Sequence, residues 1–320
     1  MKKAFIIIAI VLLILGCAIF FAALASAKFD FRNLETDKLQ TKTYPVSEDF
    51  QNIQIDEKTA DVIFAVSPDG TCSVVCCETE KDVHRVTVEE GTLKIVSEHK
   101  SGWRTWLSVS FENESVTVYL PKDTYDTLTI ETHTGDVEIP QGLNFYDIDV
   151  TGSTGDVRCA ASVSNKLSIG LSTGDVTLSG VSAAAIKCTV TTGDIRFASV
   201  SCAGDVQVKV GTGRTIIDGL TCQSLSSEGS TGKAQFRNVV VSGLLAVERS
   251  TGDVQFDNSD AGEIRVKTTT GDVTGTLRTG KTFVTKSSTG DVSVPQSGEG
   301  GRCEITTSTG DIGIRIADGQ

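Results

Sequence analysis

Apolar and polar residues alternate along residues 128–320 in short runs that recur at a fixed distance from a repeated glycine. Apolar residues stand seven and five positions before it and two and four positions after it, as Leu167, Ile169, Val176 and Leu178 do around Gly174. A weaker third pair stands seven and nine positions after it. Period-two alternation indicates β-strands, and no window of this region has the i, i+3, i+4, i+7 spacing of an amphipathic helix.

The glycines stand in Thr-Gly-Asp or a close variant and set the length of the repeat. They are Gly135, Gly155, Gly174, Gly193, Gly213, Gly232, Gly252, Gly271, Gly290 and Gly310. Successive glycines are 19 or 20 residues apart, a period typical of repeat architectures. Equivalent strands of successive repeats must then stack at about 4.8 Å. The pattern predicts an all-β fold, a parallel β-solenoid (β-helix) of about ten coils and roughly 45–50 Å length.

The repeated tripeptide has a structural interpretation as the turn between strands. Glycine accepts a positive φ at the bend, threonine can stack as a hydroxyl ladder, and aspartate can accept hydrogen bonds from nearby backbone N–H groups. Two neighbouring coils carry Arg214 and Lys233 where the others carry aspartate. They stand between Asp194 and Asp253, so we expect a mixed-charge column that relieves repulsion along the aspartates.

The N-terminal sequence predicts a membrane anchor. Residues 1–3 form a short positive stub, expected in the cytoplasm, and residues 4–27 carry no charge. This run exceeds the roughly 20 residues that span a bilayer, so we expect a single-pass cell-membrane protein with its C-terminal domain extracytoplasmic. Two alternatives stay open, lipidation at Cys17 and signal-peptidase cleavage after Ala27. All three place the remaining chain outside the cytoplasmic membrane.

Between this run and the repeats the sequence is β-like but irregular. Residues 28–44 have alternating charge and are expected to form a tether, and residues 45–127 an irregular β segment that caps the solenoid. The expected strands there are 53–55, 62–66, 73–77, 83–88, 92–96, 107–111, 116–120 and 128–130. The chain ends without a capping helix, so we expect its last coil to expose an edge guarded only by Arg315 and Asp318.

The composition of the chain argues against one class of partner and fits a narrow core. The 320-residue chain has a formal charge of −12 and a pI near 4.8, which argues against a nucleic-acid partner. Aromatic residues make up 6% and glycine contributes 31 residues, which suits a narrow core of small β-branched side chains.

The nine cysteines are interpreted mainly as core residues. Those that fall on inward positions are Cys159, Cys188, Cys202, Cys222 and Cys303. Free cysteine behaves as a small hydrophobic residue. Cys202 and Cys222 occupy equivalent positions in adjacent coils, so a disulfide between them remains an alternative. No CxxC pair is present, and Cys76 and Cys77 must face opposite sides of one strand, so no zinc site is predicted.

Candidate ligand sites are few, and we predict no catalytic residue and no cofactor. A weak calcium site is one interpretation of the corner carboxylates, which are Asp136, Asp156, Asp175, Asp253, Asp272 and Asp291. Trp103 and Trp106 lie in a basic stretch of an acidic chain and could stack on sugar rings. The mixed-charge column could imitate the site of a polysaccharide-cleaving β-helix, but no loop insertion interrupts the coils to build a cleft.

The chain resembles the bacterial putative-adhesin family of β-strand-repeat proteins, a domain of unknown function. The resemblance rests on residues 50–55, 59–62 and 118–121 and on the Thr-Gly-Asp repeats. It implies a membrane-tethered or secreted β-helix of the bacterial cell envelope, and no catalytic residues. We therefore expect a non-enzymatic extracytoplasmic binding or scaffold protein whose partners are the membrane and a cell-wall glycan or a membrane protein. Two alternatives are an envelope-stress accessory that binds a membrane protein, and a carbohydrate-active β-helix enzyme.

Overall fold

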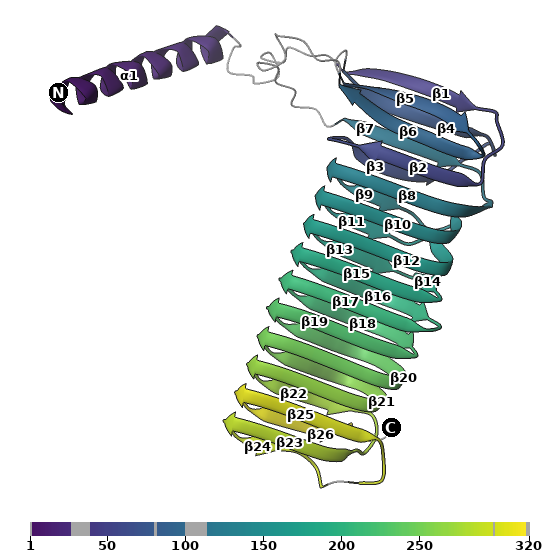
Figure 1. Ribbon diagram of the computed structural model, residues 1–320, viewed down its shortest axis with the longest axis vertical. Coiled ribbons are helices and arrows are strands. Elements are labelled where there is room, and N and C mark those ends of the chain that lie inside the picture. Colours follow the sequence, from purple (N-terminus) through teal and green to yellow (C-terminus); the bar gives the residue numbers. More distant parts are fainter. Residues whose placement is uncertain (1, 27–38, 80–81, 100–113, 297, 318–320) are drawn as a thin grey trace.

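The computed structural model of the protein describes residues 2–26, 39–79, 82–99, 114–296 and 298–317 (Figure 1). Its helix is α1 (Lys2–Ser26). Within the described ranges, no helix has both the length and the hydropathy needed to cross a membrane, so the membrane-spanning helix expected over residues 4–27 is not found.

The described remainder is built from strands, and 26 of them form one continuous sheet. Their bounds are β1 (Gln40–Val46), β2 (Asn52–Glu57), β3 (Asp61–Val66), β4 (Cys72–Glu78), β5 (Asp82–Glu89), β6 (Thr92–His99), β7 (Ser115–Leu120), β8 (Thr124–Thr134), β9 (Val137–Ile139), β10 (Asn144–Thr154), β11 (Val157–Cys159), β12 (Ser162–Thr173), β13 (Val176–Ser179), β14 (Ser182–Ala183), β15 (Ala185–Thr192), β16 (Ile195–Cys202), β17 (Asp205–Thr212), β18 (Thr215–Cys222), β19 (Ser224–Thr231), β20 (Ala234–Thr251), β21 (Val254–Thr270), β22 (Val273–Leu277), β23 (Thr282–Thr289), β24 (Val292–Ser293), β25 (Arg302–Thr309) and β26 (Ile312–Ile316).

Equivalent strands of successive coils pair in parallel, which confirms the parallel β-solenoid (Figure 1). Ile130 pairs with Val150, and Val150 pairs with Ile169, so residues at the same distance from the corner glycine lie side by side. The ten corner glycines bound nine intervals, and the solenoid has about nine turns, one fewer than expected from the count of glycines.

The apolar positions before and after each glycine fill the core between the faces of the solenoid. The weaker third pair is buried too, since Val200 and Cys202 are each 3% exposed. Phe236 and Phe256 stack with ring centroids 5.5 Å apart. Full burial of an aliphatic or aromatic side chain of this kind contributes about 1.5–3 kcal/mol to the free energy of folding. Every coil buries several such side chains and so adds to the stability of one continuous core.

At the N-terminal end the chain folds back on itself. The first coil, β2 with β3, pairs on one side with β8 and β9 and on the other with β6 and β7. Antiparallel strands then cover this end, with β5 on β6, β4 on β7 and β1 on β4. Residues 40–44, expected as tether, belong instead to β1, which pairs antiparallel with β4. The strand expected at 107–111 lies outside the described residues.

The C-terminal end has a coil order that the sequence did not suggest. Strands β25 and β26 lie between β21–β22 on one side and β23–β24 on the other (Figure 1). The outermost coil is therefore residues 282–293, and the expectation that the chain end forms the open edge is wrong. The inward side chains give the reason: the inserted coil places Ile305 in the core, 0% exposed, where the outer coil has Thr285. Val292, the outer-coil partner of the buried Ile312, is 45% exposed.

Candidate functional site

The corner glycines form a stacked ladder along one edge of the solenoid. Gly193 has a φ of 139°, and a Cβ built on it would lie 2.0 Å from the carbonyl oxygen of Gly174. The same approach recurs from corner to corner down to Gly310 on Gly271 and Gly290 on Gly310. Glycine is therefore required at this position for two reasons: the backbone has a positive φ, and the neighbouring coil leaves no room for a Cβ.

The corner aspartates bind the backbone of the next coil. The N–H of Asp156 donates to Asp136 Oδ1 at 2.8 Å. Equivalent bonds of 2.7–3.3 Å run from Asp136 to Asp61, Asp175 to Asp156, Asp194 to Asp175, Arg214 to Asp194, Asp272 to Asp253, Asp311 to Asp272 and Asp291 to Asp311. The carboxylate therefore works as a turn acceptor, as expected, and its donor comes from the neighbouring coil.

The mixed-charge column is present where the aspartate is replaced. Arg214 lies 2.6 Å from Asp194, and Lys233 lies 3.1 Å from Asp253. Arg196 adds a bridge between Asp175 and Asp194, at 2.6 and 2.5 Å. Partial burial raises the pKa of Asp175, but the bonds from the Asp194 N–H and the Arg196 guanidinium outweigh it and hold that pKa below its usual value.

The weak calcium site at the corner stays a prediction. Its candidate carboxylates Asp136, Asp156, Asp175 and Asp272 each commit Oδ1 to a backbone N–H, and Asp136, Asp156 and Asp175 also pair Oδ2 with arginine. Trp103 and Trp106 lie outside the described residues. Among the described residues, Phe50, Tyr125, Phe145 and Phe64 pack against one another at the N-terminal end.

The cysteines all carry free thiols in the structure, so Cys202 and Cys222 are not bonded to each other. The five on inward positions are buried, as expected for core residues. Burial raises the pKa of Cys159 to about 11 and that of Cys222 to about 12.

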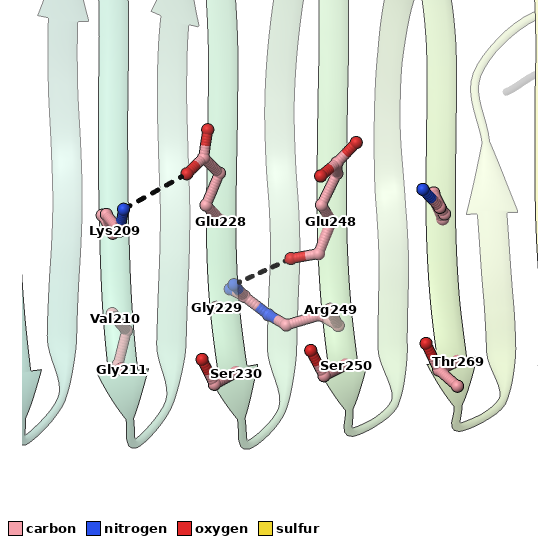
Figure 2. Close-up of a pocket in the computed structure, with 11 residues that line it drawn as sticks. Lys209, Val210, Gly211, Glu228, Gly229, Ser230, Glu248, Arg249, Ser250 and Thr269 are labelled. Carbon is pink, nitrogen blue, oxygen red and sulfur yellow. Dashed lines mark hydrogen bonds and ion pairs between the residues drawn. The ribbon is translucent and has the colours of Figure 1, made fainter.

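Three adjoining hollows lie along one face of the solenoid, over β15, β17, β19, β20, β21 and β25. Their volumes are about 320, 370 and 480 Å³. Neighbouring hollows share residues: Lys209 and Glu228 line the first two, and Glu248 and Lys267 line the first and third. We call this surface the hollowed face. Its central row is Lys209, Glu228, Glu248 and Lys267, which pair across successive strands. Figure 2 labels the first three of these residues.

The hollowed face is polar and open to solvent. Lys209 and Glu228 lie 3.8 Å apart, with side chains 67% and 54% exposed. Beside the charged row run small polar residues, Ser230, Ser250 and Thr269 (Figure 2). These exposed carboxylate, ammonium and hydroxyl groups can contact a polar ligand.

Comparison with protein families gives a match over residues 50–212 and again over 202–320, to the family described as Toastrack DUF4097. The chain belongs to the Toastrack DUF4097 family. A comparison with curated proteins found no match.

Two solved structures of putative adhesins are similar to this chain. A putative adhesin from Parabacteroides merdae is 12% identical, with a TM-score of 0.50 over 75% of this chain and 97% of the other. A putative adhesin from Parabacteroides distasonis is 14% identical, with a TM-score of 0.48 over 87% and 98%. At this identity, the similarity to the structure from Parabacteroides merdae shows the fold alone.

Inside this Toastrack chain, Arg249 is a buried cation behind the hollowed face. It is 4% exposed, and Nη2 donates to Thr215 Oγ1 at 2.7 Å and to Ser227 Oγ at 3.0 Å. Gly229 makes the room, because a Cβ there would lie 2.1 Å from Nη1. Burial lowers the pKa of Arg249 to about 10. No ion pair to Arg249 occurs within the described ranges, so the sequence carries an uncompensated charge in its core.

Sequence reasoning missed two sets of residues. The charged row of the hollowed face was visible in principle, since each member stands four positions before a corner glycine. The second set is the buried cluster of Cys76, Glu78 and His84 in the N-terminal cap. Cys76 is two positions from Glu78, but His84 comes from the next strand, and no spacing rule connects it to the others.

Proposed function

We propose that this chain is a non-enzymatic binding or scaffold protein that presents the hollowed face to a glycan of the bacterial cell wall. The observation that carries the proposal is the row of adjoining hollows that crosses successive coils, lined by exposed Lys, Glu, Ser and Thr side chains. A repeating polar surface of this kind suits a ligand that itself repeats, because each coil offers similar contacts at a fixed spacing.

The location outside the cytoplasm is part of this proposal. It is supported by the uncharged run of residues 4–27, which follows Lys2 and Lys3. The test is protease treatment of intact cells after removal of the wall, followed by detection of the solenoid with an antibody. Cleavage in intact cells supports the location, and protection until the cells are lysed contradicts it.

Binding is tested by co-sedimentation of the purified chain with isolated cell walls. We expect saturable binding, and we expect charge reversal at Lys209 and Lys267 (K209E with K267E) to weaken it at least tenfold. The matched control is Lys166→Glu, an exposed lysine on β12 outside the three hollows. Equal loss in both variants, or no saturable binding, contradicts the hollowed face as the binding surface. A parallel series with a calcium chelator tests the weak calcium site at the corner.

A second candidate function, an accessory that binds a membrane protein, is favoured by the open edge at β23–β24. The outer side of these strands has no partner strand among the described residues, and Val284 and Val292 are exposed there. Such an edge can accept a strand from another protein. Crosslinking in intact cells from position 286, an exposed position on β23, is expected to capture a membrane protein, and Val284→Lys is expected to abolish that product. A crosslink that survives Val284→Lys contradicts edge pairing.

A further inference from the structure

Two β-strands of the N-terminal cap bring a thiol, a carboxylate and an imidazole together in the core. Cys76 and Glu78 lie on one face of β4, and His84 lies on β5. Cys76 and Glu78 are 0% exposed and His84 is 6% exposed. The sulfur, one carboxylate oxygen and one ring nitrogen all lie within 4.8 Å of one another, the one such group of metal-ligating types among the described residues.

We propose that Cys76, Glu78 and His84 bind a divalent transition-metal ion, with zinc the ion that this donor set fits best. Zinc accepts thiolate, imidazole and carboxylate ligands, commonly in tetrahedral sites. Calcium and magnesium prefer sites made of oxygen alone, and the sulfur ligand selects against them. Three protein ligands leave a fourth position for water or another small ligand.

The orientation of His84 supports this assignment. Its Nε2 lies 2.8 Å from Glu57 Oε2, and Glu57 is itself fixed because Oε1 accepts the N–H groups of Lys58, Thr59 and Ala60 at 2.8–3.3 Å. A carboxylate that holds one ring nitrogen is the usual outer partner of a metal-binding histidine. The other nitrogen, Nδ1, faces the cluster and lies 3.2 Å from Glu78 Oε2.

The charges balance with the ion in place. Carboxylates of Glu57 and Glu78 and the thiolate of Cys76 supply three negative charges, and the ion together with Lys42, which pairs with Glu78, supplies three positive charges. On binding, the ion takes the positions of the thiol proton and of a proton on Nδ1, and both protons leave to solvent. The competing state has no metal and holds a protonated His84 between the two carboxylates.

Cobalt(II) is the probe for the test, because a thiolate ligand to cobalt gives a charge-transfer absorption that oxygen and nitrogen ligands do not. We expect the full-length chain to develop this band on titration and to saturate at one ion per chain. Cys76→Ser is expected to lose the band. Cys77→Ser is the matched control, since it removes the neighbouring thiol, which is not part of the cluster, and it is expected to keep the band.

A third variant tests the outer partner. Glu57→Gln keeps the size of the side chain and removes the charge behind His84, so we expect the cobalt affinity to fall roughly 10–100-fold while the band itself stays. Circular dichroism and thermal unfolding of each variant check that the fold is kept. Zinc-edge X-ray absorption of the wild-type chain gives a reading that needs no variant, with one sulfur neighbour expected. No charge-transfer band in the wild type, a band that survives Cys76→Ser, or no sulfur neighbour at zinc each overturns the proposal.

Discussion

The backbone N–H of Asp311 donates a 2.8 Å hydrogen bond to Oδ1 of Asp272, a residue 39 positions earlier in the chain. The intervening corner residue, Asp291, then donates its own N–H to Asp311 Oδ1 at 2.8 Å. The corner ladder thus runs from 272 to 311 to 291, and the last coil in sequence is the next-to-last coil in space. Deleting residues 311–320 would consequently remove an internal strand, so such a deletion cannot test the exposed edge.

Ile305 and Val292 should differ sharply in their contribution to stability. Ile305 is buried in the inserted coil and pairs with Val266 on one side and Thr285 on the other. We expect Ile305→Ala to cost about 2–5 kcal/mol and to raise amide exchange in both β25 and β23. Val292→Ala is the control, because Val292 stands at the equivalent inward position of Ile312 but on the outer coil, where it is exposed, and its expected cost is below about 1 kcal/mol. Hydrogen–deuterium exchange measures both, and similar protection in the two variants would contradict the coil order.

Corner glycines are expected to resist substitution, whereas Gly170, within strand β12, is expected to accept it. Gly193→Ala places a methyl group 2.0 Å from the Gly174 carbonyl at a φ of 139°, so we expect a loss of more than about 2 kcal/mol. A methyl group on Gly170 would instead meet no other atom within 4 Å. Gly170→Ala should therefore be neutral, or stabilise by up to about 1 kcal/mol. Urea unfolding compares the two, and equal midpoints would refute the corner argument.

The aspartate ladder predicts a second contrast, between an internal corner and the last one. Asp194 accepts the Arg214 N–H at 2.7 Å, pairs with Arg196 and Arg214, and has a side chain only 13% exposed. We expect Asp194→Ala to cost about 2 kcal/mol, the scale of a hydrogen bond to a charged group. Asp291 ends the ladder, and within the described residues no further coil donates to its carboxylate. Asp291→Ala is expected to stay within about 0.5 kcal/mol of wild type, and a loss as large as that of Asp194→Ala would show that the acceptor role is not what stabilises the corner.

The buried thiols should alkylate only when the solenoid opens. Burial raises the pKa of Cys159 to about 11 and those of Cys222 and Cys303 to about 12, and the thiolate is the reacting form. Their thiolate fraction is small at neutral pH and rises about tenfold per unit, so at pH 9 it is still minor. We expect peptide mapping to show slow native labelling at pH 7 and 9 and full labelling after denaturation without reductant. Thiols that stay unlabelled after denaturation would reveal disulfides.

The sequence by itself determined the solenoid, its corners and its core. In a stacked repeat each residue has the same surroundings as its counterpart one coil away, so the local alternation and the requirement for glycine are repeated in the sequence with the period of the fold. Val150 and Ile169 are partners because they stand at the same distance from a corner, and this can be read without coordinates. The mixed-charge column around Arg214 and the inward position of Cys188 follow from the same rule.

Tertiary structure alone decided the order of coils at the two ends and the contents of the N-terminal cluster. The corners at Gly271, Gly290 and Gly310 have the same local chemistry, so their sequences do not state which stacks on which; the better apolar face of the 302–316 coil, with Ile305 and Ile312, places it inside. Glu57 meets His84 across 27 residues, where irregular strands break the period. Away from the repeat, sequence distance no longer reports spatial distance, and only packing between the faces brings those side chains together.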